Sequence, residues 1–556
     1  MKINRLPTHQ TPLTPHSPSP LIRGKGTGDR GKAVLTLLAL SAVLYFLKLG
    51  SFSLYDAAET TYGEFVKNMV QMGNWLTLHY NAQVIFDKPP LYYWAVALIS
   101  WLIGFNEWAM RLPAALAGVL TVLTTYLLGK KFYNERVGLL AGLIVMTAFQ
   151  FLVQSRIAEL DIVLTLFLSL SLLWFYSGYT TNDRRYYLAM YLPMALAILI
   201  KGLIGIALPG CAIFLFLLFK RETKKILELR LIPGLLIVLA IGLPWYAAEY
   251  YLHGQVFLDF ALGFLFLARF GNVVAGHTGP PYYYFISILL GFAPYSQFLP
   301  LALWRSAKNW RNDPELLALA YIIPTFLVFS VAKTKLPSYL LPLFPFFAIM
   351  VAKLWADFID DWKPEKEWKP ANELRGFHSA MLFSVISLLV VSILIVLGFV
   401  IAGTSNYQME YQAFLPILAA LGAALFLGSF CALILFLIKR YELSFYSLPV
   451  MAAVVALILI FWALPLAEEY KGTKYLGREV AKVIQPDETI AAYETGNRPS
   501  VVFYNVKPVQ FLSTEAEVKV FLARKKGYLF TAVGELKKIK KYGRIFKEKG
   551  ELAVVI

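Results

Sequence analysis

The chain has 556 residues, of which 58% are hydrophobic, and its formal net charge at neutral pH is +17. With a mean hydropathy of +0.59 it is too apolar and too long for one soluble core, so a polytopic membrane protein is the class that fits. Lysines and arginines lie in short clusters between apolar runs, which excludes nucleic acid as the expected partner. The two cysteines, Cys211 and Cys431, lie inside apolar runs and give no support to a disulfide framework or a cysteine-ligated zinc site.

The N-terminal part changes character twice. Residues 1–32 are rich in Pro, Ser, Thr and Gly, which predicts a disordered cytoplasmic tail. The apolar run 33–49 is long enough to span a membrane and has no small-residue cleavage site after it, so we expect a signal anchor. Residues 51–111 mix charges with aromatics, which predicts a large external loop with helices lying in the membrane interface.

Further apolar segments bring the expected number of transmembrane helices to about thirteen. They lie at 112–129, 137–153, 161–178, 187–200, 203–219, 231–250, 282–303, 315–331, 339–355, 379–402, 412–437 and 446–464. Because the basic clusters fall in alternate connections, all on the side of the N-terminus, the positive-inside rule predicts a cytoplasmic N-terminus and an external, or periplasmic, C-terminus. The expected location is the cytoplasmic or inner membrane.

Residues 466–556 are more charged and predict a small external α/β domain, which covers or presents a substrate. Its expected strands are 489–493, 500–504, 528–533 and 551–556, and its expected helices are 475–484 and 514–523. Residues 33–465 would then form the transmembrane catalytic domain.

The segment Phe86-Asp87-Lys88-Pro89-Pro90-Leu91 places an acid and a base before two prolines. Consecutive prolines fix φ and remove two backbone donors, so Asp87 and Lys88 are expected on a stiff turn that holds the pair still. The alternative is that the prolines only mark the start of the helix from Leu91. The predicted topology places the turn outside and favours a functional role.

Other ionisable residues at external span ends point to the same face, where such groups are usually functional or paired. Each also has a structural alternative. Asp56 and Glu59 fit a helix capping box, Arg156 and Asp161 a salt bridge, His277 a loop hydrogen bond, and Lys333 and Lys335 interface anchoring. Lys201 has almost no loop around it, and a buried lysine needs an anion.

Several motifs together resemble the integral-membrane glycosyltransferases of the GT-C class, specifically the aminoarabinose transferase and protein O-mannosyltransferase superfamily. They are the acidic first external helix, Asp87-Lys88-Pro89-Pro90, Arg111-Leu112-Pro113, Arg156 with Asp161, Lys201-Gly202, Leu243-Pro244-Trp245-Tyr246, Gly276-His277-Thr278-Gly279-Pro280 and Lys335-Leu336-Pro337. Enzymes of that family transfer a sugar from an undecaprenyl or dolichyl phosphate to an acceptor at the external face. The resemblance implies a polytopic GT-C fold and the same reaction here, with a lipid, glycan or protein as acceptor and membrane lipids as further partners.

External cations would stabilise the leaving phosphate, and a carboxylate would accept a proton if the acceptor is a hydroxyl. If the acceptor is a lipid phosphate, no base is needed. We therefore assign the candidate site residues by role. Donor phosphate ligands are Lys88, Arg269, Lys201, Lys335 and Arg156; catalytic carboxylates are Asp56, Glu59 and Asp161; and contacts to the substrate or a cation are Asp87, His277, Tyr62 and Tyr339.

The chain departs from the family pattern at two places. An aspartate of the first external helix is replaced by Ala58, so its role falls to Asp56 or Glu59, and a Glu-His pair is replaced by Phe264 and Leu265. The second change leaves a divalent cation without an evident ligand set. The prediction is an inverting hexosyl or pentosyl transferase, in keeping with lipid A modification or protein glycosylation. A lipid or sugar-lipid flippase, and a binding homologue without catalysis, are the alternatives.

Overall fold

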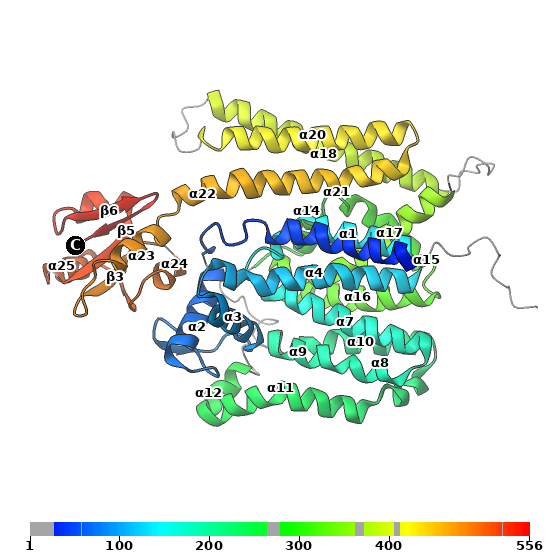
Figure 1. Ribbon diagram of the computed structural model, residues 1–556, viewed down its shortest axis with the longest axis horizontal. Coiled ribbons are helices and arrows are strands. Elements are labelled where there is room, and N and C mark those ends of the chain that lie inside the picture. Colours follow the sequence, from blue (N-terminus) through cyan, green and yellow to red (C-terminus); the bar gives the residue numbers. More distant parts are fainter. Residues whose placement is uncertain are drawn as a thin grey trace, which may run out of the picture.

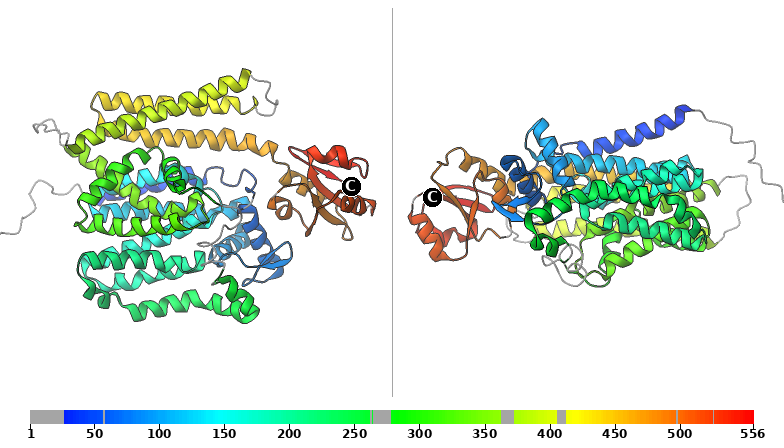
Figure 2. Two further views of the ribbon diagram at one scale, coloured as in Figure 1. Left: turned by 180° about the vertical axis from the view of Figure 1, so that it is seen from behind. Right: turned by 90° about the horizontal axis from the view of Figure 1, so that it is seen from below.

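The computed structural model describes residues 27–56, 58–261, 263, 278–361, 372–404, 412–496, 498–524 and 526–556. Long helices lie side by side in layers, and a small sheet domain at the C-terminus lies beyond one end of them (Figure 1). Helix α1 (Thr27–Phe46) begins at the opposite end of this bundle, as a second view also shows (Figure 2). The two ends of the described chain therefore lie on opposite sides of the helical layer.

Eight helices in the described ranges are long and apolar enough to cross a membrane, which confirms a polytopic helical membrane protein. A helix is present in every segment expected to span, but the total of about thirteen crossings stays a prediction. The helices of the bundle after α1 are α4 (Glu107–Phe132), α5 (Glu135–Thr147), α6 (Phe149–Gln154), α7 (Leu160–Thr181), α8 (Arg184–Ala189), α9 (Tyr191–Lys201), α10 (Ile204–Phe219), η1 (Thr223–Leu229), α11 (Leu231–His253), α12 (Gln255–Leu258), α14 (Tyr283–Gly291), η3 (Ser296–Phe298), α15 (Leu299–Lys308), α16 (Asp313–Val331), η4 (Pro337–Leu343), α17 (Phe344–Asp361), α18 (Asn372–Thr404), α20 (Leu415–Leu437), α21 (Tyr441–Ile458), η5 (Leu459–Ala463) and α22 (Leu464–Tyr470).

Three of the expected spans are interrupted, one of them, 187–200, by the turn residue Met190 between α8 and α9. The segment 282–303 is not one helix, because α14 ends at Gly291 and α15 begins at Leu299, with Pro294 between them, a residue that cannot donate to the preceding turn. The segment 137–153 breaks at Ala148, where the backbone is extended. The Phe149 N–H donates to the Ala293 carbonyl at 3.1 Å, so the two breaks lie against each other.

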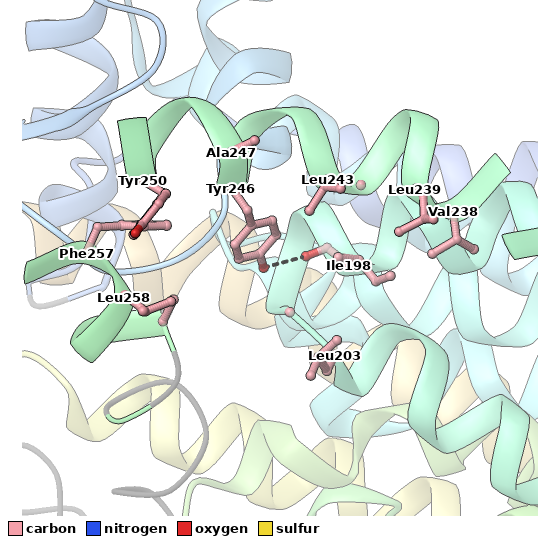
Figure 3. A pocket seen from close by; sticks show the side chains of 13 residues that line it. Ile198, Leu203, Val238, Leu239, Leu243, Tyr246, Ala247, Tyr250, Phe257 and Leu258 are labelled. Carbon is pink, nitrogen blue, oxygen red and sulfur yellow. Dashed lines mark hydrogen bonds between the residues drawn. The ribbon is translucent and has the colours of Figure 1, made fainter. Parts of the chain in front are cut away.

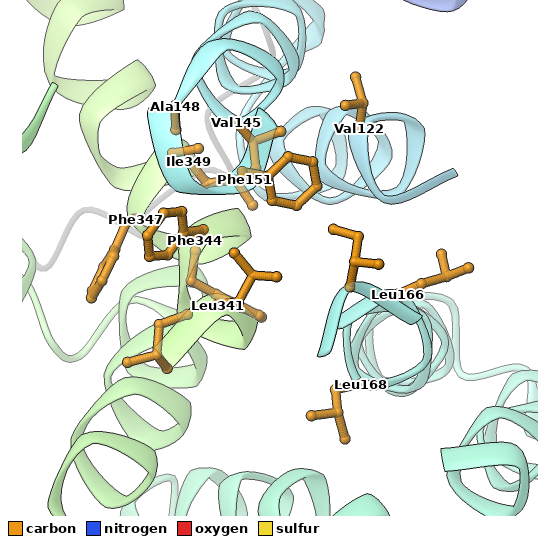
Figure 4. Packing of buried hydrophobic residues seen from close by; sticks show 14 of the residues in the cluster. Val122, Val145, Ala148, Phe151, Leu166, Leu168, Leu341, Phe344, Phe347 and Ile349 are labelled. Atoms are coloured by element: carbon orange, nitrogen blue, oxygen red, sulfur yellow. The ribbon is translucent and has the colours of Figure 1, made fainter. Parts of the chain in front are cut away.

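The packed centre of the bundle is formed by α4 to α7 and by η4 with α17. Side chains such as Val122, Phe151, Leu166 and Phe344 interdigitate there (Figure 4). In the central part of the span through η4 and α17, 94% of residues are buried, against 17% in the span from α21 to α22. The outer layer of α18, α20 and α21 therefore leaves most of its apolar surface for lipid.

The segment between α1 and α4 contains α2 (Ala58–Met72), a hairpin of β1 (Leu78–Tyr80) and β2 (Gln83–Ile85), and α3 (Leu91–Ile103). The hairpin was not anticipated from the sequence. Its two turn residues, Asn81 and Ala82, have φ of 50° and 64°. Positive φ at both central positions is what a two-residue hairpin turn requires.

The C-terminal sheet has the strand order β4-β3-β5-β7-β6, in which β3 is parallel to β4 and β5, and β7 is antiparallel to β5 and β6. Its elements are α23 (Thr473–Ala481), β3 (Thr489–Tyr493), α24 (Pro499–Phe503), β4 (Val509–Leu512), α25 (Glu515–Ala523), β5 (Gly527–Ala532), η6 (Val533–Glu535), α26 (Leu536–Ile539), β6 (Ile545–Lys549) and β7 (Leu552–Val555). The expected strand 500–504 is wrong, because this segment is the helix α24. Strands β4 and β6 were not expected.

The sheet domain is attached to α2 and to the hairpin by side chain to backbone contacts. Asp56 Oδ1 accepts from the Ser500 N–H at 2.9 Å, within the first turn of α24. Lys67 of α2 donates to the carbonyls of Phe503 and Asn505 just beyond that helix. Asn81 pairs with both backbone groups of Val509, at 2.8 and 2.9 Å. The domain is thus held against the segment between α1 and α4 rather than tethered loosely.

Candidate active site

The Asp87–Lys88 turn lies between β2 and α3, at the end of the bundle that carries the sheet domain (Figure 1). Lys88 Nζ lies 2.6 Å from Asp87 Oδ1, and the two side chains are 16% and 21% exposed. The Tyr93 hydroxyl lies 3.5 Å from the other carboxylate oxygen, and the Lys88 ammonium lies 5.5 Å from the centre of the Tyr62 ring. The pair is therefore held between aromatic side chains with one side open to solvent.

A second acid–base pair joins α7 to the end of α9. Asp161, in the first turn of α7, accepts a hydrogen bond from Lys201, the last residue of α9, and both side chains are largely buried. The Lys201 ammonium lies 4.2 Å from the centre of the Tyr339 ring in η4. Gly202, with φ of 77°, ends α9 directly after the lysine. This placement leaves Lys201 at the helix end, where Asp161 is its anionic partner among the described residues.

Glu159 lies two residues before Asp161 and is a third acid near the Asp87–Lys88 and Asp161–Lys201 pairs. The sequence motifs did not single it out. It precedes the first turn of α7, and within the described ranges its carboxylate has no hydrogen-bond partner. Burial, together with the neighbouring Asp161, raises the pKa of Glu159 to about 8, against the opposing influence of Lys201 and Lys88. Both lysines therefore act on the same carboxyl group.

We refer to Asp87, Lys88, Glu159, Asp161 and Lys201 as the charged cluster. Tyr62 of α2 belongs to its rim, because the centre of its ring lies 5.5 Å from the Lys88 ammonium. Burial raises the pKa of its phenol well above the usual value, and Glu159 and Asp87 add to the effect. Residues from α2, the turn before α3, α7, α9 and η4 thus meet at one end of the bundle. Six of the predicted site residues lie here: Tyr62, Asp87, Lys88, Asp161, Lys201 and Tyr339.

Glu59 lies in a different environment. It is 1% exposed, and Arg111 binds both of its oxygens, at 2.8 and 2.7 Å. The same oxygens also accept from the backbone N–H groups of Tyr55 and Ala158. Because its acceptor positions are filled, Glu59 is not free to take a proton from a substrate, and the geometry gives it a structural role in place of the predicted catalytic one.

Asp56 lies just before α2, and its observed contact is with the sheet domain. The carboxylate accepts from the N–H of Ser500, as described above, which makes it an N-cap for α24 supplied from another part of the chain. The structure gives no contact between Asp56 and the charged cluster within the described residues. Its predicted role as a base is unsupported by this placement.

Two predicted phosphate ligands instead cap helices through main-chain carbonyls. Arg156 donates to Leu44, Tyr45 and Leu47 at the end of α1. Lys335 donates to Ser330 and Ala332 at the end of α16, at 2.7 and 2.6 Å. The donors of both side chains therefore serve the free carbonyls of helix ends, and a phosphate would have to compete with them.

Two further predicted residues, Arg269 and His277, lie outside the described residues. In the part of the chain that is described, no group of three or more His, Cys, Asp or Glu side chains is arranged to hold a metal ion. The identity of any cation thus rests on no geometry seen here.

An apolar groove of about 420 Å³ lies beside Lys201. Ile198 and Gly202, on either side of the lysine in the chain, line it together with Leu243 and Tyr246 of α11 (Figure 3). Most side chains that line the groove are apolar. The hydroxyl of Tyr246, a polar group of the lining, already donates to the Ile198 carbonyl at 3.4 Å. A long apolar chain is the kind of ligand that fits such a surface.

The helix that lines this groove, α11, also holds the segment that leads into Asp87. Thr77 donates to Glu249 Oε1 at 2.9 Å, and its hydroxyl lies 2.9 Å from His253 Nε2. The ring of Phe86, directly before Asp87, packs against His253 and Phe257 with centroids 5.1 and 5.5 Å apart. The groove and the Asp87–Lys88 turn are therefore positioned by one helix.

The sequence is similar to a family model and to several known proteins. Residues 87–247 match the family model of dolichyl-phosphate-mannose-protein mannosyltransferases. An uncharacterised Aquifex aeolicus protein is 28% identical over 84% of this chain and 85% of its own length. An undecaprenyl phosphate-alpha-4-amino-4-deoxy-L-arabinose arabinosyl transferase of Edwardsiella ictaluri is 31% identical over 57% of this chain. The match spans 58% of that transferase, which is less than two thirds of its length.

Solved structures agree in fold. ArnT of Cupriavidus metallidurans, in its crystal structure bound to undecaprenyl phosphate, superposes with a TM-score of 0.76 at 21% identity, over 94% of this chain and 97% of that one. An Archaeoglobus fulgidus oligosaccharyltransferase superposes with a TM-score of 0.55 at 11% identity, over 92% of this chain and 70% of that one. The chain therefore has the GT-C fold of integral-membrane glycosyltransferases, and its resemblance to the aminoarabinose transferase and protein O-mannosyltransferase superfamily is confirmed.

Proposed function

We propose that the protein is a glycosyltransferase that takes a sugar from a polyprenyl phosphate and transfers it to a lipid, glycan or protein acceptor at the external face of the membrane. The observation that carries this proposal is that Lys88 and Lys201, from two distant segments, lie at one apolar cluster that contains Phe86, Leu91 and Leu199, beside an apolar groove. A polyprenyl phosphate sugar has the matching chemistry: a long apolar tail, an anion and a polar head. The relatives' names point to the same class of donor.

The donor would bind with its tail along α11 and its phosphate at the lysines. Both ammonium groups are now paired with aspartates, Lys88 with Asp87 and Lys201 with Asp161. A phosphate would share or displace these carboxylates, and the resulting charge-assisted hydrogen bonds are stronger than neutral ones. The Lys88 side chain is more exposed than the Lys201 side chain. We therefore assign Lys88 as the main phosphate ligand.

In the reaction, an acceptor oxygen attacks the anomeric carbon while the bond from that carbon to the phosphate oxygen breaks. The phosphate keeps the electron pair, and its growing negative charge is stabilised by Lys88 and Lys201. A single displacement of this kind inverts the anomeric configuration. When the acceptor is a hydroxyl, its proton passes to a carboxylate, for which Asp161 and Glu159 are the candidates in the cluster.

The test uses full-length protein in membranes, with a panel of polyprenyl phosphate sugars and mass spectrometry of the glycolipid and glycoprotein products. We expect Lys88→Ala to reduce transfer at least a hundredfold, because the leaving phosphate loses its cation. Lys130→Ala, at the opposite end of α4, is the matched control and should keep normal activity. Full transfer by Lys88→Ala in correctly inserted protein would remove the phosphate assignment.

A further inference from the structure

Glu249, near the end of α11, is a buried acid that the proposed reaction does not use. It is 1% exposed, and within the described residues no lysine or arginine pairs with it. Its Oε1 accepts from the Thr77 hydroxyl at 2.9 Å, and its Oε2 lies 3.6 Å from His253 Nε2, one turn further along the helix. An apolar side chain of similar size would pack here at lower cost, so the carboxylate needs a role beyond packing.

Thr77, Glu249 and His253 share one hydrogen-bonded group, which we call the Thr77 clamp. A hydroxyl has a single proton, and here it goes to Glu249, so His253 must donate from Nε2 to the Thr77 oxygen at 2.9 Å. Trp245 adds a bond from its Nε1 to the Leu76 carbonyl at 3.1 Å. Trp245, Glu249 and His253 are spaced four apart, so one face of α11 holds Leu76 and Thr77.

A neighbouring face of the same helix lines the apolar groove (Figure 3). Leu243, Tyr246, Ala247 and Tyr250 lie on it, with the spacing i, i+3, i+4 and i+7 of one helix face. Leu243 and Tyr250 are 50% and 51% exposed, so they offer surface that an apolar chain can reach. Helix α11 thus presents one face to the tail of the donor and another to the Thr77 clamp.

The chain just beyond α11 joins the groove to the Asp87–Lys88 turn a second time. Phe257 of α12 lies in the groove wall, and its ring packs against Phe86 with centroids 5.5 Å apart. The His253 ring of the clamp lies against Phe86 as well, at 5.1 Å. Phe86 immediately precedes Asp87 and Lys88 in the chain. The groove wall, the clamp and the turn are therefore joined by continuous contacts.

We propose that Thr77, Glu249 and His253 are positioning residues that make the rate of sugar transfer depend on the apolar tail of the donor. The inference rests on the proposed function and adds to it a determinant of donor specificity. A tail in the groove packs on α11, and the clamp passes this restraint to the turn that places Lys88 at the phosphate. The binding energy of the tail is then used in the transition state, so a donor with a short tail loses turnover as well as affinity.

The experiment measures kcat and KM of the full-length protein with two donors that carry the same sugar, the best substrate of the panel above. One donor is built on undecaprenyl phosphate and the other on geranyl phosphate. We expect the unmodified protein to turn over the undecaprenyl donor about tenfold faster at saturation. Thr77→Val, which exchanges the hydroxyl for a methyl group, should lower this kcat to about that of the geranyl donor and leave KM nearly unchanged. Thr77→Ser keeps the hydroxyl and should keep the preference.

Two further variants separate positioning from a loss of stability. Thr514→Val removes the N-cap of α25 in the sheet domain, so it should lower stability without changing kcat or the preference for the long tail. Phe86→Leu removes the aromatic contacts with His253 and Phe257 and should reduce the same preference. It tests the coupling independently of the buried carboxylate, also where Thr77→Val does not fold. Thermal unfolding in detergent reports the folded fraction of each variant.

An equal fractional loss of kcat with both donors in Thr77→Val and Phe86→Leu would make the clamp a structural feature only and overturn the inference. Unchanged kcat in both variants would overturn it too, as would an unmodified protein whose kcat is the same for the two tails. In these cases the proposed function stands, because sugar is still transferred. A lack of transfer from every polyprenyl phosphate sugar of the panel would instead remove the proposed function, and this inference with it.

Discussion

At the scale of single residues, the role of a carboxylate in this protein follows from how many of its acceptor positions are already used. Glu59 accepts from Arg111 and from two backbone N–H groups, and so has little capacity left. Asp161 has one cation, Lys201, and Glu159 has no hydrogen-bond donor within the described ranges. The last two therefore have acceptor positions left for chemistry.

The first consequence concerns Glu59. Replacing it with Gln leaves the Arg111 charge buried without its counterion, so we expect a loss of about 3–5 kcal/mol in the free energy of unfolding. Lys130→Gln, which breaks the exposed pair with Glu135, should cost less than about 1 kcal/mol. Thermal unfolding in detergent measures both. The turnover of the folded Glu59→Gln fraction should stay near normal; a large drop in that turnover would restore the catalytic assignment.

The second consequence concerns Glu159. With its pKa raised to about 8, the carboxyl is protonated below that pH and becomes a base above it. If the acceptor is a hydroxyl, the turnover number should rise through about pH 8. Glu159→Gln should lower turnover by about 10²- to 10⁴-fold and remove this rise. Glu135→Gln, at the start of α5, is the control. An unchanged pH profile in Glu159→Gln would exclude Glu159 as the base, and a flat profile in the unmodified protein would favour a phosphate acceptor.

At the scale of elements, the helices of the bundle were predictable because long apolar runs between basic clusters have few other solutions. The segment 500–504 was not. Its sequence, Ser-Val-Val-Phe-Tyr, is rich in strand-forming residues, but Pro499 sets the first helical turn and Asp56 caps it from a residue far away in the chain. A cap supplied over such a distance leaves no local trace in the sequence.

The sequence predicted only part of the charged cluster, because contacts between distant segments decide the rest. Asp161 and Lys201 sit at span ends, and Asp87 and Lys88 in the connection between α1 and α4, places where an ionisable residue already signals function. Arg156 and Lys335 sit at span ends too, but their donors reach the carbonyls of neighbouring helix ends. Spacing along the chain cannot separate a cation that caps a helix from one that awaits a phosphate, because the difference lies in which helix end is nearby.

At the scale of the whole molecule, the chemistry-bearing parts are gathered at one end of the helical layer. The segment between α1 and α4, the short helix α12 and the sheet domain all lie there, while α1 begins at the other end (Figures 1 and 2). A donor whose phosphate lies at a membrane surface and whose tail lies in the bilayer matches this layout. The layout also means that the proposed reaction depends on which side of the membrane the sheet domain faces.

The basic connections and the sheet domain lie at opposite ends, so the positive-inside rule predicts that the sheet domain faces outward. A variant with Cys211 and Cys431 changed to Ser supplies a cysteine-free background. In that background, Lys519→Cys on α25 should react with a membrane-impermeant maleimide in intact cells, whereas Lys224→Cys on η1 should react only after permeabilisation. Both positions are solvent-exposed, so they are matched in accessibility. The reverse pattern would place the charged cluster on the cytoplasmic side, where the proposed transfer at the external face could not take place.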